Sequence, residues 1–201
     1  MGRLPQLLAP APQFVRLAPM AKPKPDYFPL IAGAALYYVH VDYSQSEPEV
    51  TRMILRVVSA AQDGDALRAQ VTKQWGAATP QTQELRVDGK GAWADKNLEI
   101  RFPPKLGDAW DAADDPYYKR MILSMKAKAG TIVKDFTDCL EVGFTNEDTD
   151  SGSRFYAPGL GLVREEWAGE SRNSVLSLAD WRIPGQVQTL KRQLTAKPRG
   201  K

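Results

Sequence analysis

The sequence predicts an all-β protein, an antiparallel meander of about ten strands that forms a curved sheet or a partly open barrel. Two observations predict it. Apolar and polar residues alternate with period two in most of the segments between residues 37 and 183, and Asp, Asn and Gly residues separate these segments at regular intervals. Helical periodicity is almost absent, so we expect only short helical pieces, near residues 106–113 and 187–195.

The first three strands show the alternation most clearly. Apolar residues occupy every second position of residues 37–43, and the pattern returns in residues 52–57 and 67–75. Between the second and third runs, Asp63 and Gly64 predict a hairpin, because an Asp-Gly pair supplies the positive φ angles that match strand twist. The remaining strands are expected near residues 85–88, 92–94, 98–102, 121–126, 140–144, 154–157, 162–167 and 175–183.

A single β domain is expected over residues 26–185, between two basic tails. Residues 1–25 contain six prolines, which prevent a regular helix or a paired strand, so we expect this tail to be disordered. Nine of the 27 basic residues lie in residues 1–25 and 186–201, where there is no acidic residue. The remaining 18 face all 24 acidic residues, which gives residues 26–185 a net charge of −6. Nucleic-acid binding by this folded body is therefore not expected.

A glycine-proline corner lies between two of the predicted strands. Pro158 presets φ for a turn, and Gly159 and Gly161 permit positive φ or a bulge. Glycine-rich turns also cradle phosphate, but such turns usually precede a helix, whereas the residues that follow Gly161 predict a strand. We therefore interpret the corner as structural.

Four short motifs occur in an order that resembles a known group of domains: residues 26–30 (DYFPL), 106–110 (LGDAW), 136–142 (FTDCLEV) and 155–163 (FYAPGLGLV). Together they resemble the TapB-like and related unknown-function β-rich domains of bacterial secreted proteins and lipoproteins. The resemblance implies a curved sheet similar to the half-barrel of lipoprotein carriers, a place in the cell envelope or periplasm, and no established catalytic residues. No uninterrupted apolar run typical of a secretory signal is present, so a cytoplasmic location is the alternative.

The residue types that usually carry catalysis are scarce, and an enzyme is not expected. His40 is the only histidine and Cys139 the only cysteine, so a zinc site or a Cys-His pair is almost excluded. We interpret His40 as a structural or solvent-facing residue and Cys139 as a small buried hydrophobe. The acidic segment with Asp108, Asp111, Asp114 and Asp115 lacks a calcium-loop pattern and is interpreted as a solvated loop. No cofactor or metal is predicted.

The leading hypothesis is a non-enzymatic binding module whose curved sheet holds an apolar ligand, a lipid or a partner segment. Some of the tryptophans are candidates to line such a cleft, although filling the core is the commoner role. These candidates are Trp75, Trp93, Trp110, Trp167 and Trp181. The alternative is an assembly protein that docks to a partner through apolar residues of the proline-rich tail. Those residues are Leu7, Leu8, Phe14, Val15 and Leu17. A hydrolase-type enzyme comes third. No transmembrane segment is expected.

Overall fold

The computed structural model describes residues 26–112, 115–145, 150–169 and 172–185, which form one antiparallel sheet of twelve strands. Their bounds are β1 Ala35–Asp42, β2 Glu49–Asp63, β3 Ala66–Trp75, β4 Gln81–Val87, β5 Gly91–Ala94, β6 Asn97–Arg101, β7 Ala109–Ala112, β8 Asp115–Gly130, β9 Asp135–Thr145, β10 Ser151–Ala157, β11 Gly161–Ala168 and β12 Ser174–Arg182. The all-β prediction is confirmed. The expected tails, residues 1–25 and 186–201, lie outside the described residues.

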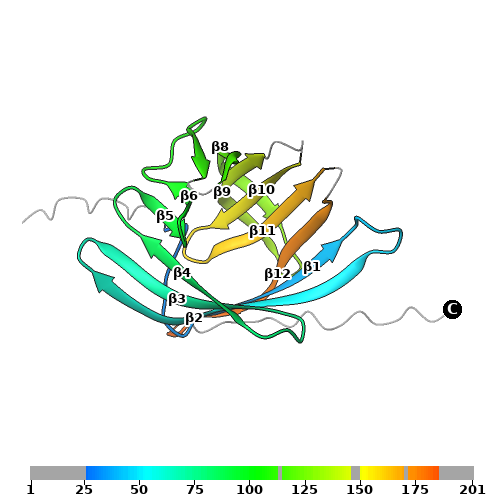
Figure 1. Ribbon diagram of the computed structural model, residues 1–201, viewed down its shortest axis with the longest axis horizontal. Helices are drawn as coiled ribbons and strands as arrows, with labels where there is room; N and C mark the ends of the chain where they lie inside the picture. The colour runs from blue at the N-terminus through cyan, green and yellow to red at the C-terminus, as the bar shows by residue number, and fades with distance from the viewer. Residues whose placement is uncertain (1–25, 113–114, 146–149, 170–171, 186–201) are drawn as a thin grey trace, which may run out of the picture.

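The strand order is β6-β5-β4-β3-β2-β1-β12-β11-β10-β9-β8-β7. The sheet therefore consists of two meanders, β1–β6 and β7–β12, which join where β1 pairs with β12. Figure 1 shows the sheet curled round, with β2 and β3 on one side of the interior and β8–β11 on the other. The curl brings the two ends of the strand order, β6 and β7, near each other.

Side chains, not a backbone ladder, close the seam between β6 and β7 in the described part of the chain. Trp110 of β7 donates its indole N–H to the carbonyl oxygen of Leu98 in β6, at 2.8 Å. Arg101 at the end of β6 contacts the Asp108 carboxylate and the Ala109 carbonyl oxygen, each at 3.2 Å. The sheet is thus almost a closed barrel, and one of its seams depends on three side chains.

Period-two alternation places one face of each strand in the core, as the sequence predicts. In β9, Leu140, Val142 and Phe144 are buried, and in β8 Ile122 is buried between the more exposed Met121 and Leu123. The residues before β1 complete the interior, because Tyr27 and Leu30 are buried within it. Cys139 is also buried, and burial raises the pKa of its thiol to about 11, with a smaller contribution from Asp138.

The two turns singled out in the sequence have the geometry that their residues favour. The predicted hairpin between β2 and β3 is confirmed, and Gly64 has a φ of 57°. Its two connecting residues are Gly64 and Asp65, because Asp63 is the last residue of β2. At the glycine-proline corner between β10 and β11, Gly159 has a φ of 73° and Gly161 a φ of 91°. The Gly159 N–H donates to the Asp26 carbonyl oxygen at 2.6 Å, which ties this corner to the start of the described chain.

The helix expected near residues 106–113 is wrong. Residues 109–112 form β7, which pairs with β8, and Trp110 and Ala112 are buried while Ala109 and Asp111 are exposed. Four residues are too few to separate a helical from a strand pattern, and pairing with β8 decides the outcome. The described residues contain no helix, and the second expected piece, residues 187–195, lies outside them.

Candidate functional site

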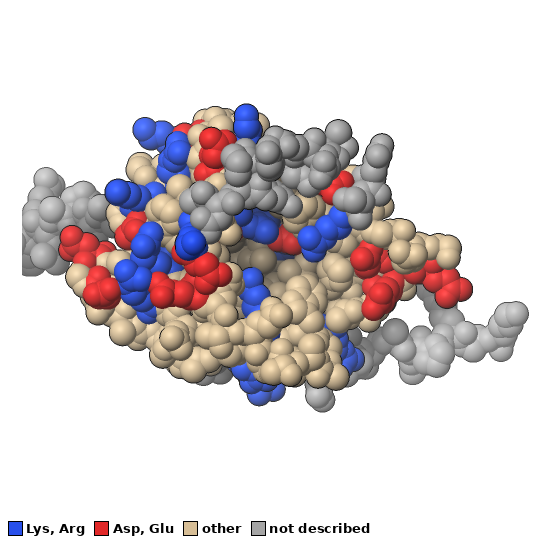
Figure 2. All heavy atoms as spheres, in the orientation of Figure 1, with Lys and Arg blue, Asp and Glu red and all other residues tan. Residues whose placement is uncertain are grey.

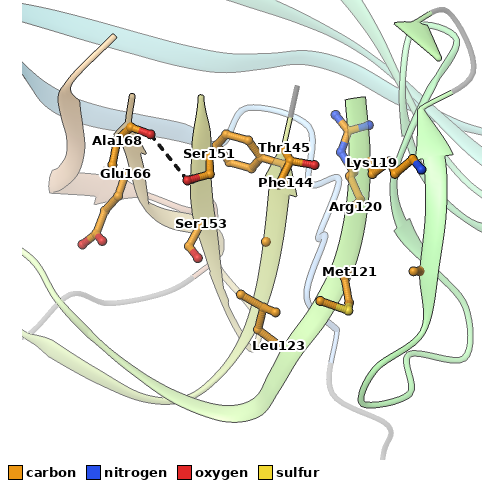
Figure 3. Close-up of a pocket in the computed structure, with 13 residues that line it drawn as sticks. Lys119, Arg120, Met121, Leu123, Phe144, Thr145, Ser151, Ser153, Glu166 and Ala168 are labelled. Atoms are coloured by element: carbon orange, nitrogen blue, oxygen red, sulfur yellow. Dashed lines mark hydrogen bonds between the residues drawn. The ribbon is translucent and has the colours of Figure 1, made fainter. Parts of the chain in front are cut away.

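A groove of about 520 Å³ lies on the outer face of β7–β11 (Figure 3). One row of cross-strand neighbours lines its centre: Ala109, Met121, Gly143, Ser153 and Glu166. A second row lies two residues further along the strands: Lys119, Thr145, Ser151 and Ala168. We call this hollow the outer groove.

Met121 and Leu123 give the outer groove its apolar character. Each is 42% exposed, although both are large hydrophobic residues in a strand whose other face is buried. Gly143 provides room beside them, since a Cβ atom there would lie 2.6 Å from a methyl carbon of Leu123. Figure 3 shows Met121 and Leu123 on the side of the sheet away from the Arg120 side chain. The groove thus exposes apolar surface on a sheet face that usually carries polar residues.

Polar side chains surround Met121 and Leu123, which form the apolar floor of the groove. Ser153 donates its hydroxyl to Glu141 at 3.0 Å, and Ser151 contacts the carbonyl oxygen of Ala168 at 3.4 Å. Glu166 is paired with Arg164. The Ser151 and Ser153 hydroxyls and the Glu166 carboxylate are therefore already bonded within the protein, whereas the apolar side chains of Met121 and Leu123 are partly exposed to solvent.

The interior contains a second feature, a row of charged residues that we call the interior charged cluster. Its members are Lys73 of β3, Glu99 of β6, Arg120 of β8, Arg154 of β10 and Glu165 of β11. Glu99 accepts from Arg120 Nη2 at 3.0 Å and also from Arg154. Arg154 donates from Nε to Glu165 at 2.6 Å, and Glu165 accepts from the Trp167 indole at 2.8 Å.

Burial and neighbouring charges act in opposite directions on these groups. Burial favours the neutral form of Glu165, but Arg154 and the Trp167 hydrogen bond outweigh it, so the pKa of Glu165 lies below its ordinary value. Burial also opposes the charge on Arg154, yet Glu99 and Glu165 raise its pKa well above the ordinary value. Burial lowers the pKa of Lys73, and Arg154 lowers it further. The cluster thus favours the charged forms of Arg154 and Glu165 and disfavours charge on Lys73.

The five candidate tryptophans do not converge on one cleft. Trp110 and Trp167 are buried and bonded through their indole N–H groups, to Leu98 and Glu165 respectively. Trp75 is 36% exposed at the end of β3, where its ring packs edge-on against His40 with the ring centroids 5.4 Å apart. The Arg86 guanidinium lies 4.6 Å from the Trp93 ring centroid. Trp181 packs against Phe136, with ring centroids 6.1 Å apart.

The remaining candidates are also separate from one another. His40 is half-buried in β1, and its Nε2 atom has no described hydrogen-bond partner. Asp108 is bonded to Arg101 at the seam, Asp111 is exposed in β7, Asp114 is not described, and Asp115 begins β8. No group of three or more potential metal ligands occurs among the described residues. Leu7, Leu8, Phe14, Val15 and Leu17 lie outside the described residues.

The sequence analysis missed both the outer groove and the interior charged cluster. The run Met121-Ile122-Leu123 was the available signal for the groove, because three successive apolar residues in a strand place apolar side chains on both faces. Glu99 and Arg154 had a weaker signal. Glu99 lies between Leu98 and Ile100, and Arg154 precedes Phe155, but nothing local shows that both charged side chains point inward.

Comparison with known proteins identifies the fold but not a family. No family model matches the chain, and no curated protein matches it. A solved structure from Bacteroides fragilis, described as an exported protein with a YmcC-like fold, is similar with a TM-score of 0.57 and 12% identity. The similarity covers 79% of this chain and 100% of that one. A protein from Parabacteroides distasonis, described as a lipoprotein, has a TM-score of 0.54 and 12% identity, over 80% and 100% of the two chains.

These similarities show that the chain shares its β fold with proteins described as exported or as lipoproteins. The more specific TapB-like relationship, inferred from the four motifs, stays a prediction. No helix long and apolar enough to cross a membrane occurs in the part of the chain that the structure describes.

Proposed function

We propose that this chain is a non-enzymatic binding module that holds a small apolar ligand in the outer groove. The observation that carries the proposal is the exposed pair Met121 and Leu123 on the floor of a hollow of about 520 Å³. Ligand sites commonly measure about 300–1,000 Å³ and combine mainly apolar walls with a few polar groups. The outer groove has this size and this composition.

The outer groove does not lie on the concave face of the sheet, where a curved sheet would be expected to hold its ligand. Much of the concave face is filled by core side chains, and the apolar cavity found there measures only about 70 Å³. That is about twice the volume of one water molecule in the liquid. An apolar ligand of ordinary size therefore fits the outer groove better than this interior cavity.

The arrangement of reactive groups favours binding over catalysis. Nucleophilic catalysis needs a nucleophile and a base within hydrogen-bond reach of each other. The described lining of the outer groove includes Ser151 and Ser153 but no histidine or cysteine. Ser153 is bonded to Glu141, whose carboxylate is the hydrogen-bonded candidate for its base. We therefore treat a hydrolase as the weaker alternative, which measurable turnover lost in Ser153→Ala would favour.

Titration with N-phenyl-1-naphthylamine, an uncharged fluorescent probe, tests the proposal. We expect saturable binding to the wild-type chain and at least about tenfold weaker binding to Met121→Glu, since a charge on the floor must be desolvated when the probe binds. Val58→Glu is the matched control, because Val58 is 61% exposed in β2, outside the groove. Absence of probe binding, or equal loss in both variants, would overturn the proposal.

The descriptions of the two structural neighbours support the proposal that this protein lies in the cell envelope. Cell fractionation with detection of the native protein is the test. Recovery in the envelope fraction is expected, and recovery only with cytoplasmic markers would contradict it.

A further inference from the structure

The interior charged cluster has hydrogen-bond donors that the described protein leaves unused. Arg120 gives Nη2 to Glu99, but its Nε and Nη1 atoms are buried without a hydrogen-bond partner among the described residues. Only 8% of the Arg120 side chain is exposed. A buried donor without a partner is costly, and in native proteins it is often explained by a bound ion, water or ligand.

Lys73 lies on the opposite side of the interior, and no described ion pair includes its amine. Its cross-strand neighbour in β2 is Leu55, a residue of the apolar core, so Lys73 lies on the inner face of β3. No described carboxylate lies within 4.0 Å of its Nζ, although Glu99, Glu165 and Asp95 are near enough to act on it electrostatically. Asp95 itself accepts hydrogen bonds from Gln83 and from the Glu84 N–H.

The charge of the cluster is not balanced. Within the cluster, the two guanidinium groups of Arg120 and Arg154 and the protonated form of Lys73 face two carboxylates, Glu99 and Glu165, which leaves one positive charge. The third carboxylate that acts on Lys73, Asp95, is exposed. The two carboxylates are already occupied by the two guanidinium groups. The cluster therefore lacks one negative charge, in surroundings that hold a single anionic group more strongly than water does.

Space is available beside these groups. Figure 2 shows the molecule hollowed near the centre of this face, with Lys or Arg atoms and Asp or Glu atoms at the hollow. A small apolar cavity adjoins the Lys73 position, because Leu55, the cross-strand neighbour of Lys73, lines it together with Tyr38 and Leu162. Tyr38 donates its hydroxyl to the Leu162 carbonyl oxygen at 2.8 Å, so this wall presents no unused polar group from that side chain.

We infer that the interior hollow of Figure 2 binds an alkyl carboxylate, with its carboxylate between Lys73 and the guanidinium groups of Arg120 and Arg154. The alkyl chain lies along the hollow, and only its end reaches the small cavity beside Leu55. A carboxylate supplies the one missing negative charge and accepts from the unused donors. The apolar cavity lined by Leu55 and Leu162 favours an alkyl chain over a small polar anion. Arg120 also lines the outer groove, whereas Lys73 and Arg154 do not, so Lys73 separates this site from the groove.

Calorimetric titration of the full chain with four matched ligands tests the inference. Octanoate is expected to bind, octan-1-ol and acetate at least about tenfold more weakly, and octylammonium not at all. The alcohol retains the chain without the charge, and acetate retains the charge without the chain. Equal affinity for octanoate and octan-1-ol would overturn the charge requirement, and acetate as strong as octanoate would overturn the role of the apolar wall.

Two variants localise the site. Lys73→Met is expected to weaken octanoate binding at least about tenfold while leaving the fold intact, because it removes a partly desolvated cation that no described carboxylate pairs with. Lys90→Met is the control, since Lys90 is exposed in the turn before β5. Arg120→Gln is expected to weaken binding as well. Unchanged octanoate affinity in Lys73→Met would overturn the inference.

The Met121→Glu variant separates this inference from the proposed function. Octanoate binding is expected to survive Met121→Glu, and binding of N-phenyl-1-naphthylamine is expected to survive Lys73→Met. Loss of octanoate binding in Met121→Glu alone would move the carboxylate to the outer groove and contradict the interior site. In a ligand-bound sample the pKa of Lys73, followed by NMR at Nζ, is expected to rise, because a nearby anion favours the charged amine.

Discussion

The interior of this sheet has two regions, one stabilised by apolar packing and the other by buried ion pairs. At the apolar core around β1, β3, β11 and β12, Tyr38, Val71, Val163 and Leu178 are at most 2% exposed. Around β6, β8 and β10 the interior holds Glu99, Arg120 and Arg154. The apolar region gains free energy from every methylene that it removes from water, whereas the charged region must first offset the desolvation of its ions.

The difference explains how the barrel-like sheet is held together. Two meanders meet at the continuous pairing of β1 with β12, where apolar packing suffices. No backbone ladder joins β6 to β7 among the described residues, and Glu99 of β6 instead reaches Arg120 of β8 and Arg154 of β10 across the interior. These interior ion pairs add to the contacts that Trp110 and Arg101 make at the seam, and apolar contacts fill the opposite side.

The strongest test of this contrast is Glu99→Ala. Removing Glu99 leaves Arg120 and Arg154 buried without their shared carboxylate, which is expected to lower the free energy of unfolding by about 3–5 kcal/mol. Glu84→Ala is the control, because Glu84 pairs with Arg68 on the surface, where a pair is worth about 0–1 kcal/mol. Urea denaturation measures both. Equal effects would show that the seam does not depend on the interior ion pairs.

Leu178→Ala probes the apolar region. Leu178 is fully buried, and truncating a buried leucine removes apolar contacts and leaves a cavity, so a loss of about 2–5 kcal/mol is expected, near the lower part of that range if neighbouring side chains collapse into the space. The same denaturation experiment applies, with Val58→Ala at an exposed position as control. A loss below about 1 kcal/mol would contradict the tight packing of this region.

A smaller effect is expected at the glycine-proline corner, which lies beside the apolar region. Gly161 has a φ of 91°, and the nearest atom to an added Cβ would be a Pro29 carbon at an unstrained 3.6 Å. Gly161→Ala is therefore expected to cost about 1 kcal/mol through backbone strain alone. Gly89→Ala, where a Cβ meets nothing within 4 Å, should change little. Equal thermal midpoints for the two variants would refute the strain.

The smallest effect concerns pH and Lys73. The folded pKa of Lys73 lies below its unfolded value, so the unfolded chain binds more protons between the two values and stability rises with pH across that window. Glu99, Arg154, Glu165 and Asp95 are the charged groups that act on it. The difference in unfolding free energy between wild type and Lys73→Met should therefore shift in favour of the wild type from pH 7 to pH 10. A constant difference would contradict the lowered pKa.

The local sequence predicted those parts of the fold that depend on neighbours along the chain. Alternation identified the strands, and Asp63 and Gly64 identified the hairpin. The short strand β7 was missed because its pairing with β8 decides its conformation. Glu99, Arg120 and Arg154 come together only when the sheet curls, so no local pattern could reveal the cluster. The tryptophans stay apart for the same reason, because sheet position, not residue type, decides which face each one occupies.

The central claim is that an apolar ligand occupies the outer groove while the apolar interior stays filled. Amide chemical shifts of the isotope-labelled chain, titrated with N-phenyl-1-naphthylamine, test this claim directly. The account predicts saturable shifts for Met121, Gly143 and Ser153, with little change at Val71 and Leu178. Shifts centred on Val71 and Leu178, with the groove residues unchanged, would contradict it.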